Sequence, residues 1–305
     1  MLSREDAEAL LRCCHLCPRD CGVDRIASAR GYCGCGAELR VARAALHFWE
    51  EPCLSGSSGS GAVFFSGCSL RCVFCQNHAI SAGNAGKIVP PERLAQIFFE
   101  LQAAGAHNIN LVTATHFAPL VAYALQEAKA QGLRLPVVYN CGGYEHVETL
   151  RLFEGLVDIY LPDLKFHSAT PAGRYANAPD YFSIAAAAIA EMQRQTGPPL
   201  YDEANMLRRG VLVRHLVLPG QEADSRRVLR YLAQRYGDEI YISLMSQYTP
   251  RQSCAAYPEL RQRLPAASYA ALVDYAADLG MENVYIQEGE SAAESFIPSF
   301  DGTGV

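Results

Sequence analysis

Three cysteines with a fixed spacing are the strongest chemical signal in this 305-residue chain. Cys68, Cys72 and Cys75 follow the apolar stretch AVFFS (62–66) in a Cys-x3-Cys-x2-Cys pattern. Three thiolates can hold three irons of a 4Fe–4S cluster, whereas four cysteines are the usual ligand set. The spacing therefore predicts a cluster with one iron open to another ligand. A zinc loop is the alternative, although zinc sites pair Cys-x2–4-Cys units with a second, distant pair.

A second group of cysteines lies near the start of the chain, and ten of the twelve cysteines fall within the first 75 residues. The predicted ligands in this group are Cys14, Cys17, Cys21 and Cys33. Four thiolates close either a tetrahedral zinc site or a second 4Fe–4S cluster, and the spacing does not separate the two. The cysteines without a predicted role are Cys13, Cys35, Cys53, Cys141 and Cys254.

The overall composition narrows the class of protein. Hydrophobic residues make up 50% of the chain and charged residues 19%, which excludes a disordered protein. The net charge of −6, without basic runs, predicts neither a nucleic-acid nor a membrane partner. A charged start and the lack of an apolar run of about 18 residues predict no signal peptide and no membrane span. We therefore expect a cytoplasmic protein, where thiols usually serve metals or catalysis.

The remaining chain alternates short apolar stretches with amphipathic ones. Strands are predicted at 62–66, 108–113, 135–140, 157–163, 211–219, 239–245 and 283–287. Helices are predicted near 91–104, 119–131, 145–154, 181–195, 223–236 and 266–279. This alternation predicts an α/β fold, a partial (β/α)6-type barrel with an N-terminal cysteine-rich metal-binding segment. The predicted divisions are a metal-binding segment (1–58), the barrel (59–290) and a C-terminal tail (291–305).

With these elements in place, the sequence resembles the radical S-adenosylmethionine (SAM) superfamily. That superfamily's signature is Cys-x3-Cys-x2-Cys with an aromatic residue before the last cysteine, a place that Phe74 holds here. The chain is most similar to pyruvate-formate-lyase-activating-enzyme-like proteins of the PflX type. The similar stretches run in order over most of residues 14–290 and include CHLCPRDCGVDR, GCSLRCVFCQN, VYNCGGYE and RRGVLVRHLVLPG.

The resemblance implies a mechanism and a set of partners. SAM would chelate the open iron, and one electron from the reduced cluster would cleave it to a 5′-deoxyadenosyl radical that abstracts hydrogen. An electron donor such as a flavodoxin or ferredoxin would supply that electron. The group's name implies that the hydrogen donor is a partner glycyl radical enzyme. Two alternatives stay open: direct action on a small molecule or another protein residue, and a cysteine-rich metal-binding or electron-transfer protein without SAM cleavage.

Two further sets of residues are expected near SAM. The superfamily's Gly-Gly-Glu stretch after the second strand is missing, so Thr113, Thr115 and His116 are the expected substitutes. A neutral imidazole can accept a hydrogen bond from an ammonium group. By resemblance, the other polar contacts to SAM are Asn140, Asp163, Lys165 and Arg214.

Composition adds a hint for Lys165. Of the 26 basic residues only three are lysines, so a lysine kept in an interior strand is expected to serve as a compact ammonium for a carboxylate. A structural ion pair between Asp163 and Lys165 is the alternative.

Overall fold

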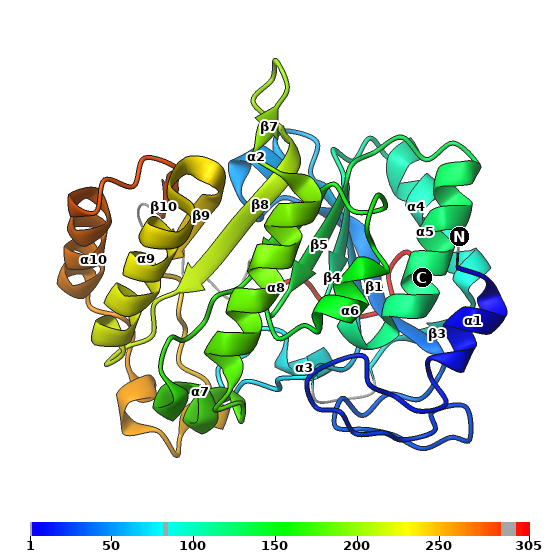
Figure 1. Cartoon of the computed structure of the whole chain (residues 1–305), viewed down its shortest axis with the longest axis horizontal. Helices are drawn as coiled ribbons and strands as arrows, with labels where there is room; N and C mark the ends of the chain where they lie inside the picture. The colour runs from blue at the N-terminus through cyan, green and yellow to red at the C-terminus, as the bar shows by residue number, and fades with distance from the viewer. Residues whose placement is uncertain (1, 82–84, 288–296) are drawn as a thin grey trace.

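Parallel strands form the centre of the fold in the computed structural model, which describes residues 2–81, 85–287 and 297–305 (Figure 1). Their order across the sheet is β2-β4-β5-β6-β8-β9-β10, and each is parallel to its neighbours. Their bounds are β2 (Ser60–Phe65), β4 (Ile109–Val112), β5 (Val137–Cys141), β6 (Ile159–Pro162), β8 (Leu207–Leu216), β9 (Tyr241–Met245) and β10 (Val284–Ile286). β2, β4, β5 and β6 are buried along their whole length, as expected of a covered parallel sheet.

Three further strands pair antiparallel at the margins of the sheet. β1 (Leu39–His47) pairs with β2, and β3 (Lys87–Val89) pairs with β1. β7 (Leu200–Tyr201) pairs with β8 and projects from one end of the molecule (Figure 1). The sheet therefore runs from β10 to β3 and stays open. This confirms the predicted α/β fold with a partial barrel.

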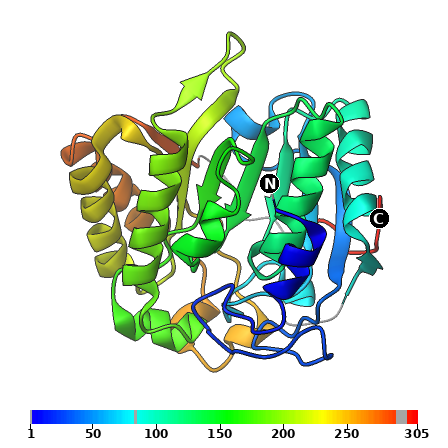
Figure 2. The same ribbon diagram turned by 45° about the vertical axis from the view of Figure 1, so that its right-hand side comes forward.

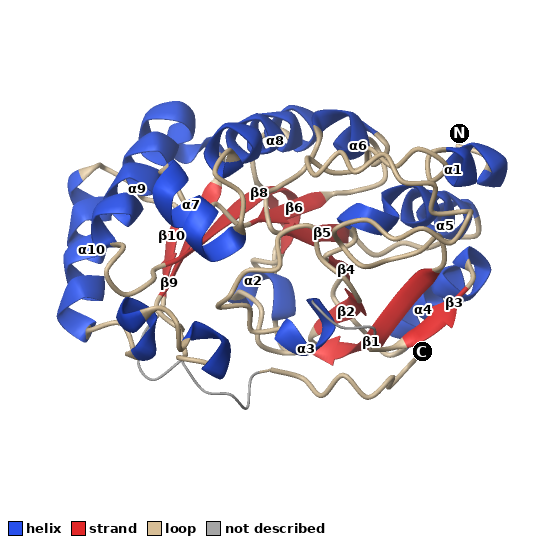
Figure 3. Cartoon of the chain, turned by 90° about the horizontal axis from the view of Figure 1, so that it is seen from below, coloured by secondary structure: helices blue, strands red, loops and turns tan. Residues whose placement is uncertain are grey.

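Helices follow the parallel strands and cover the convex side of the sheet (Figure 3). Their bounds are α4 (Pro91–Ala103), α5 (Ala118–Ala130), α6 (Val147–Arg151), α7 (Ala169–Ala176), α8 (Tyr181–Thr196), α9 (Glu222–Tyr236) and α10 (Ala266–Asp278). In α4 the buried residues Leu94, Ile97, Phe98 and Leu101 recur at helical spacing, which seats one face on the sheet. None of the described helices is long and apolar enough to cross a bilayer.

Shorter helical elements complete the described chain. They are α1 (Arg4–Ala9), α2 (Pro52–Ser55), α3 (His78–Ser81) and the 3-10 turns η1 (Thr115–Phe117), η2 (Gly237–Glu239), η3 (Gln252–Cys254) and η4 (Pro258–Arg261). α2 and α3 lie inside the curve of the sheet, on the side opposite the long helices (Figure 3). The concave side is thus covered by these two short helices rather than by the long ones.

The N-terminal residues form loops at the end of the sheet where α3 lies (Figures 1 and 2). Residues 10–38 contain no helix or strand, yet Leu11 and Leu16 are fully or almost fully buried. Residues 39–47, which the sequence analysis placed in the metal-binding segment without a strand, form β1 of the same sheet.

The C-terminal residues pack beside β1. The Ala44 amide donates to the Thr303 carbonyl at 2.9 Å, and the Gly302 amide donates to the Ala42 carbonyl at 3.0 Å. Arg43 and Asp301 form an ion pair at 3.2 Å. These contacts cover the edge of β1 that β3 leaves unpaired, which protects that edge from other chains. The predicted boundary at 290/291 lies outside the described residues.

Candidate active site

The loop that follows β2 carries the three spaced cysteines. Cys68, Cys72 and Cys75 are half-buried and line one pocket. Gly67, just before them, has φ +93°, and a Cβ there would lie 3.0 Å from the Cys33 carbonyl oxygen. Only glycine fits this tight exit from the strand without strain. The strand and its glycine therefore aim all three thiols at the same space.

Burial disfavours the thiolate forms of these cysteines, and nearby donors oppose that effect. Burial raises the pKa of Cys72, and the nearby Lys165 ammonium opposes that rise. Burial also raises the pKa of Cys68, while the Leu70 amide donates to its sulfur at 3.4 Å. Three thiols on one loop, with a cation and a backbone donor beside them, fit a cluster with three protein ligands.

An ion-pair network lines the same pocket as the cysteines. Asp163, just after β6, accepts from Lys165 and from Arg214 Nε, the latter at 3.1 Å. Burial alone would raise the pKa of Asp163, but Lys165 and Arg214 outweigh it and hold that pKa below its ordinary value. The carboxylate is therefore ionised and keeps both cations in fixed positions.

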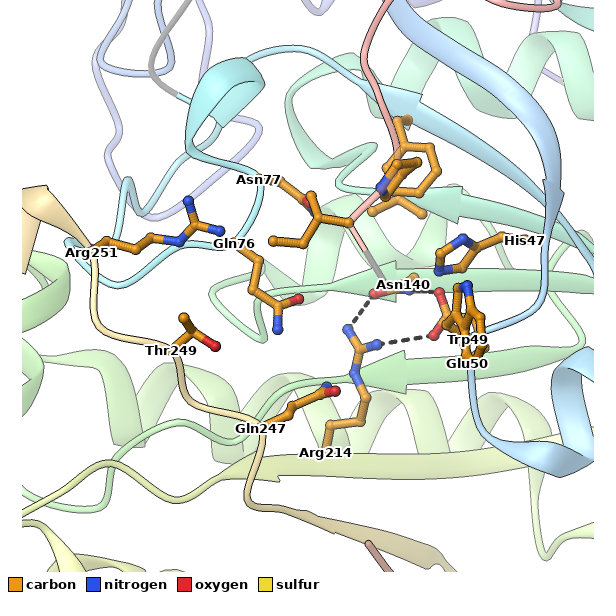
Figure 4. A pocket seen from close by; sticks show the side chains of 14 residues that line it. His47, Trp49, Glu50, Gln76, Asn77, Asn140, Arg214, Gln247, Thr249 and Arg251 are labelled. Carbon is orange, nitrogen blue, oxygen red and sulfur yellow. Dashed lines mark hydrogen bonds and ion pairs between the residues drawn. The ribbon is translucent and has the colours of Figure 1, made fainter. Parts of the chain in front are cut away.

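Arg214, in β8, is held from two further directions (Figure 4). Its Nη2 donates to Asn140 Oδ1 at 2.6 Å, and its Nη1 donates to Glu50 Oε2 at 3.2 Å. Glu50 also accepts from the amide groups of Asn110 and Asn140, at 3.0 and 3.3 Å. The guanidinium thus joins β5, β6 and the loop after β1.

Glu50 is a site residue that the sequence analysis missed. It follows β1, and its side chain is only 8% exposed inside the curve of the sheet. The strand-like stretch LRVARAALH, directly before it, is the signal that could have placed Glu50 at a strand end.

Two adjoining pockets share this network. We call the first the cysteine lobe; its lining includes Cys68, Cys72, Phe74, Cys75, Thr113, Asn140, Asp163, Lys165 and Arg214. We call the second the polar lobe; its own lining includes His47, Trp49, Glu50, Thr249 and Arg251. Both lobes are lined by Gln76, Asn77, Val112, Asn140, Arg214 and Gln247. They are therefore two parts of one opening, with Arg214 between them.

The stretch expected to replace the Gly-Gly-Glu motif divides into two parts. Thr113, with φ +62°, lines the cysteine lobe. Thr115 and His116 do not line it, so their expected contact with SAM needs correction. Thr115 Oγ1 donates to Glu145 Oε1 at 2.8 Å, and His116 Nε2 donates to the Ser66 carbonyl at 2.7 Å. The 3-10 turn Thr115–Phe117 directs both side chains into the protein interior, where both are almost fully buried.

The N-terminal cysteines are packed differently from the three on the loop. Cys14, Cys17, Cys33 and Cys35 are buried, Cys21 is half-buried and Cys13 is exposed. All twelve cysteines are free thiols. Within the described ranges, no three His, Cys, Asp or Glu side chains are arranged to hold a single metal ion. The choice between zinc and a second cluster stays a prediction.

The N-terminal segment makes direct contact with the cysteine loop. Arg19 Nε donates to the Ser69 carbonyl at 2.7 Å, and Tyr32 Oη donates to the Leu70 carbonyl at 3.3 Å. Arg19 also donates to the carbonyl groups of Asn177 and Ala176, at 2.6 and 3.2 Å. One arginine therefore ties the loop to the chain that follows α7.

Known proteins resemble this chain to different degrees. The uncharacterized protein MJ0674 of Methanocaldococcus jannaschii is 27% identical over 292 residues, which are 93% of this chain and 80% of that protein. SuiB of Streptococcus suis, solved with the precursor peptide SuiA, is 11% identical with a TM-score of 0.47, over 72% of this chain and 46% of SuiB. SuiB bound to S-adenosylmethionine gives 13% identity and a TM-score of 0.47, over 73% of this chain and 48% of SuiB. This chain spans about half the length of SuiB.

A family model decides the assignment. The model of the radical SAM superfamily matches residues 62–232, which are more than half of the chain. The match includes the three-cysteine loop, the strands that carry Asn140 and Arg214, and Asp163 just after β6. A 4Fe–4S cluster and SAM are the cofactors that this family implies. The chain belongs to the radical SAM superfamily.

Proposed function

We propose that this chain reductively cleaves SAM at a 4Fe–4S cluster held by Cys68, Cys72 and Cys75. The observation that carries the proposal is that the three thiols share one lobe with the network of Asp163, Lys165 and Arg214. When bound, the cluster and SAM supply one-electron cleavage and a radical that abstracts hydrogen. The protein supplies binding, orientation and shielding.

The polar residues of the cysteine lobe match the charged end of SAM. Lys165 presents a compact ammonium for a carboxylate, and Asp163 fixes that ammonium in place. Thr113 and Asn140 offer a hydroxyl and an amide on the neighbouring strands. Arg214 already has three partners, so we assign it the task of fixing Asp163 and Asn140.

Apolar side chains of the same lobe would keep water from the reacting atoms. Leu70, Phe74, Leu216 and Met245 all line it. Phe74 is 6% exposed and packs edge-on against Phe166, with ring centroids 6.0 Å apart. A shielded site limits side reactions of a radical.

The test is product formation by the anaerobically reconstituted protein. Incubation with dithionite and SAM should yield 5′-deoxyadenosine, and the Cys72→Ala variant should yield none above background. Equal yields from the two proteins would contradict the proposal. A wild-type protein that binds iron but forms no 5′-deoxyadenosine would instead favour an electron-transfer or metal-binding role.

The target of hydrogen abstraction is a finer question. Activation of a glycyl radical enzyme, with a flavodoxin or ferredoxin as electron donor, is supported by the sequence resemblance to the PflX type. It predicts a glycyl EPR doublet on a partner enzyme after incubation with this chain, SAM and reductant. Action on a molecule bound beside SAM is the second candidate. The polar lobe favours it, because side chains of several elements line a space that adjoins the cysteine lobe.

A further inference from the structure

The polar lobe differs from the cysteine lobe in its charge balance. In the cysteine lobe, Lys165 and Arg214 are neutralised by Asp163, and Glu50 pairs with Arg214 as well. Arg251, on the opposite side of the polar lobe from Trp49, makes no ion pair with any carboxylate of the described chain (Figure 4). Its Nη1 donates to His78 Nδ1 at 2.9 Å, and an imidazole nitrogen that accepts is uncharged. Among the residues that the structure describes, the polar lobe therefore carries one positive charge without a counter-charge.

Arg251 is fixed relative to the three-cysteine loop. Ser253 Oγ donates to the Val73 carbonyl at 2.6 Å, and Cys254 Sγ approaches the same oxygen at 3.4 Å. Val73 lies between Cys72 and Cys75, and His78 follows the same loop. A group bound to Arg251 would thus be held at a set position beside the cysteine lobe.

Neutral hydrogen-bonding groups surround this charge. Gln76 and Thr249 lie between Arg251 and Arg214, and Gln247 lies beside Arg214 (Figure 4). Amides and a hydroxyl can complete the hydrogen bonds of an anion that the guanidinium neutralises. Trp49 lines the far side of the lobe.

We propose that the polar lobe is the substrate site and that it binds a carboxylate of the substrate through Arg251. This inference rests on the proposed function, because it places the hydrogen donor beside SAM. A carboxylate has a single negative charge and two oxygens that fit the guanidinium fork. A phosphate monoester has a charge of about −1.5 to −2 and would leave excess charge in the lobe. The carboxylate can belong to a free acid or to an acidic side chain of a peptide.

The chain contains its own reporter for this site. Trp49 is the single tryptophan of the sequence, it lines the polar lobe, and it is 59% exposed. The fluorescence of Trp49 in the reconstituted, SAM-bound protein therefore reports ligands in this lobe. No reductant is added, so the titration does not depend on SAM cleavage.

The titration uses a charge-graded set of probes. Glutarate tests the free acid, and acetyl-Gly-Glu-Gly-amide tests the peptide source. Glutaramide and acetyl-Gly-Gln-Gly-amide are their neutral counterparts, and inorganic phosphate is the competing anion. We expect saturable changes with at least one acid, with a Kd at least tenfold below that of its amide, a difference of about 1.4 kcal/mol. Whether free acid or peptide binds more tightly identifies the source.

Variants then test whether Arg251 supplies the positive charge that binds the acids. Arg251→Gln should weaken acid binding at least tenfold, and Arg251→Lys should recover part of it. Arg263→Gln, at an exposed arginine outside both lobes, should leave binding unchanged. The inference is overturned if all acids and amides bind alike or not at all, if phosphate binds more tightly than every carboxylate, or if Arg251→Gln has no effect.

The two proposals can fail separately. Acid binding that depends on Arg251, in a protein that forms no 5′-deoxyadenosine, would keep the carboxylate site and remove radical chemistry. If the protein forms 5′-deoxyadenosine but the Arg251→Gln variant binds acids normally, radical chemistry would stand and the carboxylate site would be removed.

Discussion

The two groups of cysteines in this chain occupy opposite kinds of surroundings. Cys68, Cys72 and Cys75 are half-buried and face a lobe that also holds Asp163 and Lys165. Cys14, Cys17, Cys21 and Cys33 lie in loops, and three of these four thiols are buried. The cysteines of the first group thus lie where a ligand can enter, and most cysteines of the second group are enclosed by the protein. The comparison leads us to expect the reactive site where cysteines share a pocket with other polar groups, rather than where cysteines are most numerous.

The most direct test of this difference is to remove one cysteine from each group. Cys72→Ala should abolish 5′-deoxyadenosine formation, because a three-ligand cluster cannot spare a ligand. Cys33→Ala should leave at least a tenth of the wild-type rate in protein that remains folded. The rates are measured with dithionite and SAM, and circular dichroism checks folding. The opposite pattern, with Cys33 essential and Cys72 dispensable in folded protein, would reverse the assignment.

The second prediction concerns the network that distinguishes the cysteine lobe. Asp163→Asn removes the anion that holds two cations whose side chains are 16% and 17% exposed. Breaking one partner of a fully buried pair costs about 3–5 kcal/mol, and solvent at this partly exposed pair lowers that cost. We expect SAM affinity to fall about 100-fold and the thermal midpoint to fall as well. Equilibrium dialysis with SAM measures the first effect and calorimetry the second.

The control for Asp163→Asn is Asp278→Asn, at an exposed position of α10. That variant should match the wild type in both measurements. Unchanged SAM affinity in Asp163→Asn would show that the network is structural only.

The third prediction concerns the buried carboxyl group of Glu145. Burial raises the pKa of Glu145 from its ordinary 4.5 to about 7. Between pH 4.5 and 7 the folded protein therefore keeps a proton on Glu145 that the unfolded chain releases. The contribution of Glu145 to the free energy of unfolding falls as the pH rises through this range, and it is constant above about pH 7. The full difference is of order 3 kcal/mol.

Glu145→Gln should remove this part of the pH dependence, because an amide does not titrate. Calorimetry of both proteins at pH 5.5 and 7.5 tests it. The account of Glu145 would be wrong if both proteins lost the same stability between these two pH values.

The smallest expected effect concerns the contact between the two cysteine regions. Arg19→Ala removes the hydrogen bonds to the carbonyl groups of Ser69, Ala176 and Asn177, which we expect to cost about 2 kcal/mol. The cluster absorbance should then decay several-fold faster in air. Arg12→Ala, at an exposed arginine, is the matched control. Equal decay in all three proteins would mean that the N-terminal segment does not support the loop.

The sequence predicted the barrel well because its strands are buried along their length and its helices are amphipathic. α8, predicted at 181–195, runs from Tyr181 to Thr196, and α9, predicted at 223–236, runs from Glu222 to Tyr236. β1 was not predicted, although LRVARAALH is strand-like and its partner strand β2 follows closely in the sequence. The tail that covers its free edge does come from a distant part of the sequence.

Spacing singled out the three cysteines and the family resemblance singled out the four polar residues, and the structure brings both sets together, while their contacts to cluster and SAM stay a prediction. The three cysteines and Asn140, Asp163, Lys165 and Arg214 all line the cysteine lobe. Thr115 and His116 were placed there because they follow the strand that carries Thr113, but a 3-10 turn directs them inward. Glu50 could have been placed from the strand-like stretch before it, whereas Arg251 comes from a loop whose path depends on tertiary contacts, so sequence position alone could not place it.

The central claim is that the cluster held by Cys68, Cys72 and Cys75 keeps one iron open to SAM. The direct test is the EPR spectrum of the reduced, reconstituted protein before and after SAM is added, with Asp163→Asn measured beside it. The account predicts that SAM changes the spectrum of the wild type and that Asp163→Asn needs about 100-fold more SAM for the same change. A wild-type spectrum that SAM leaves unaltered at saturating concentration would contradict the claim.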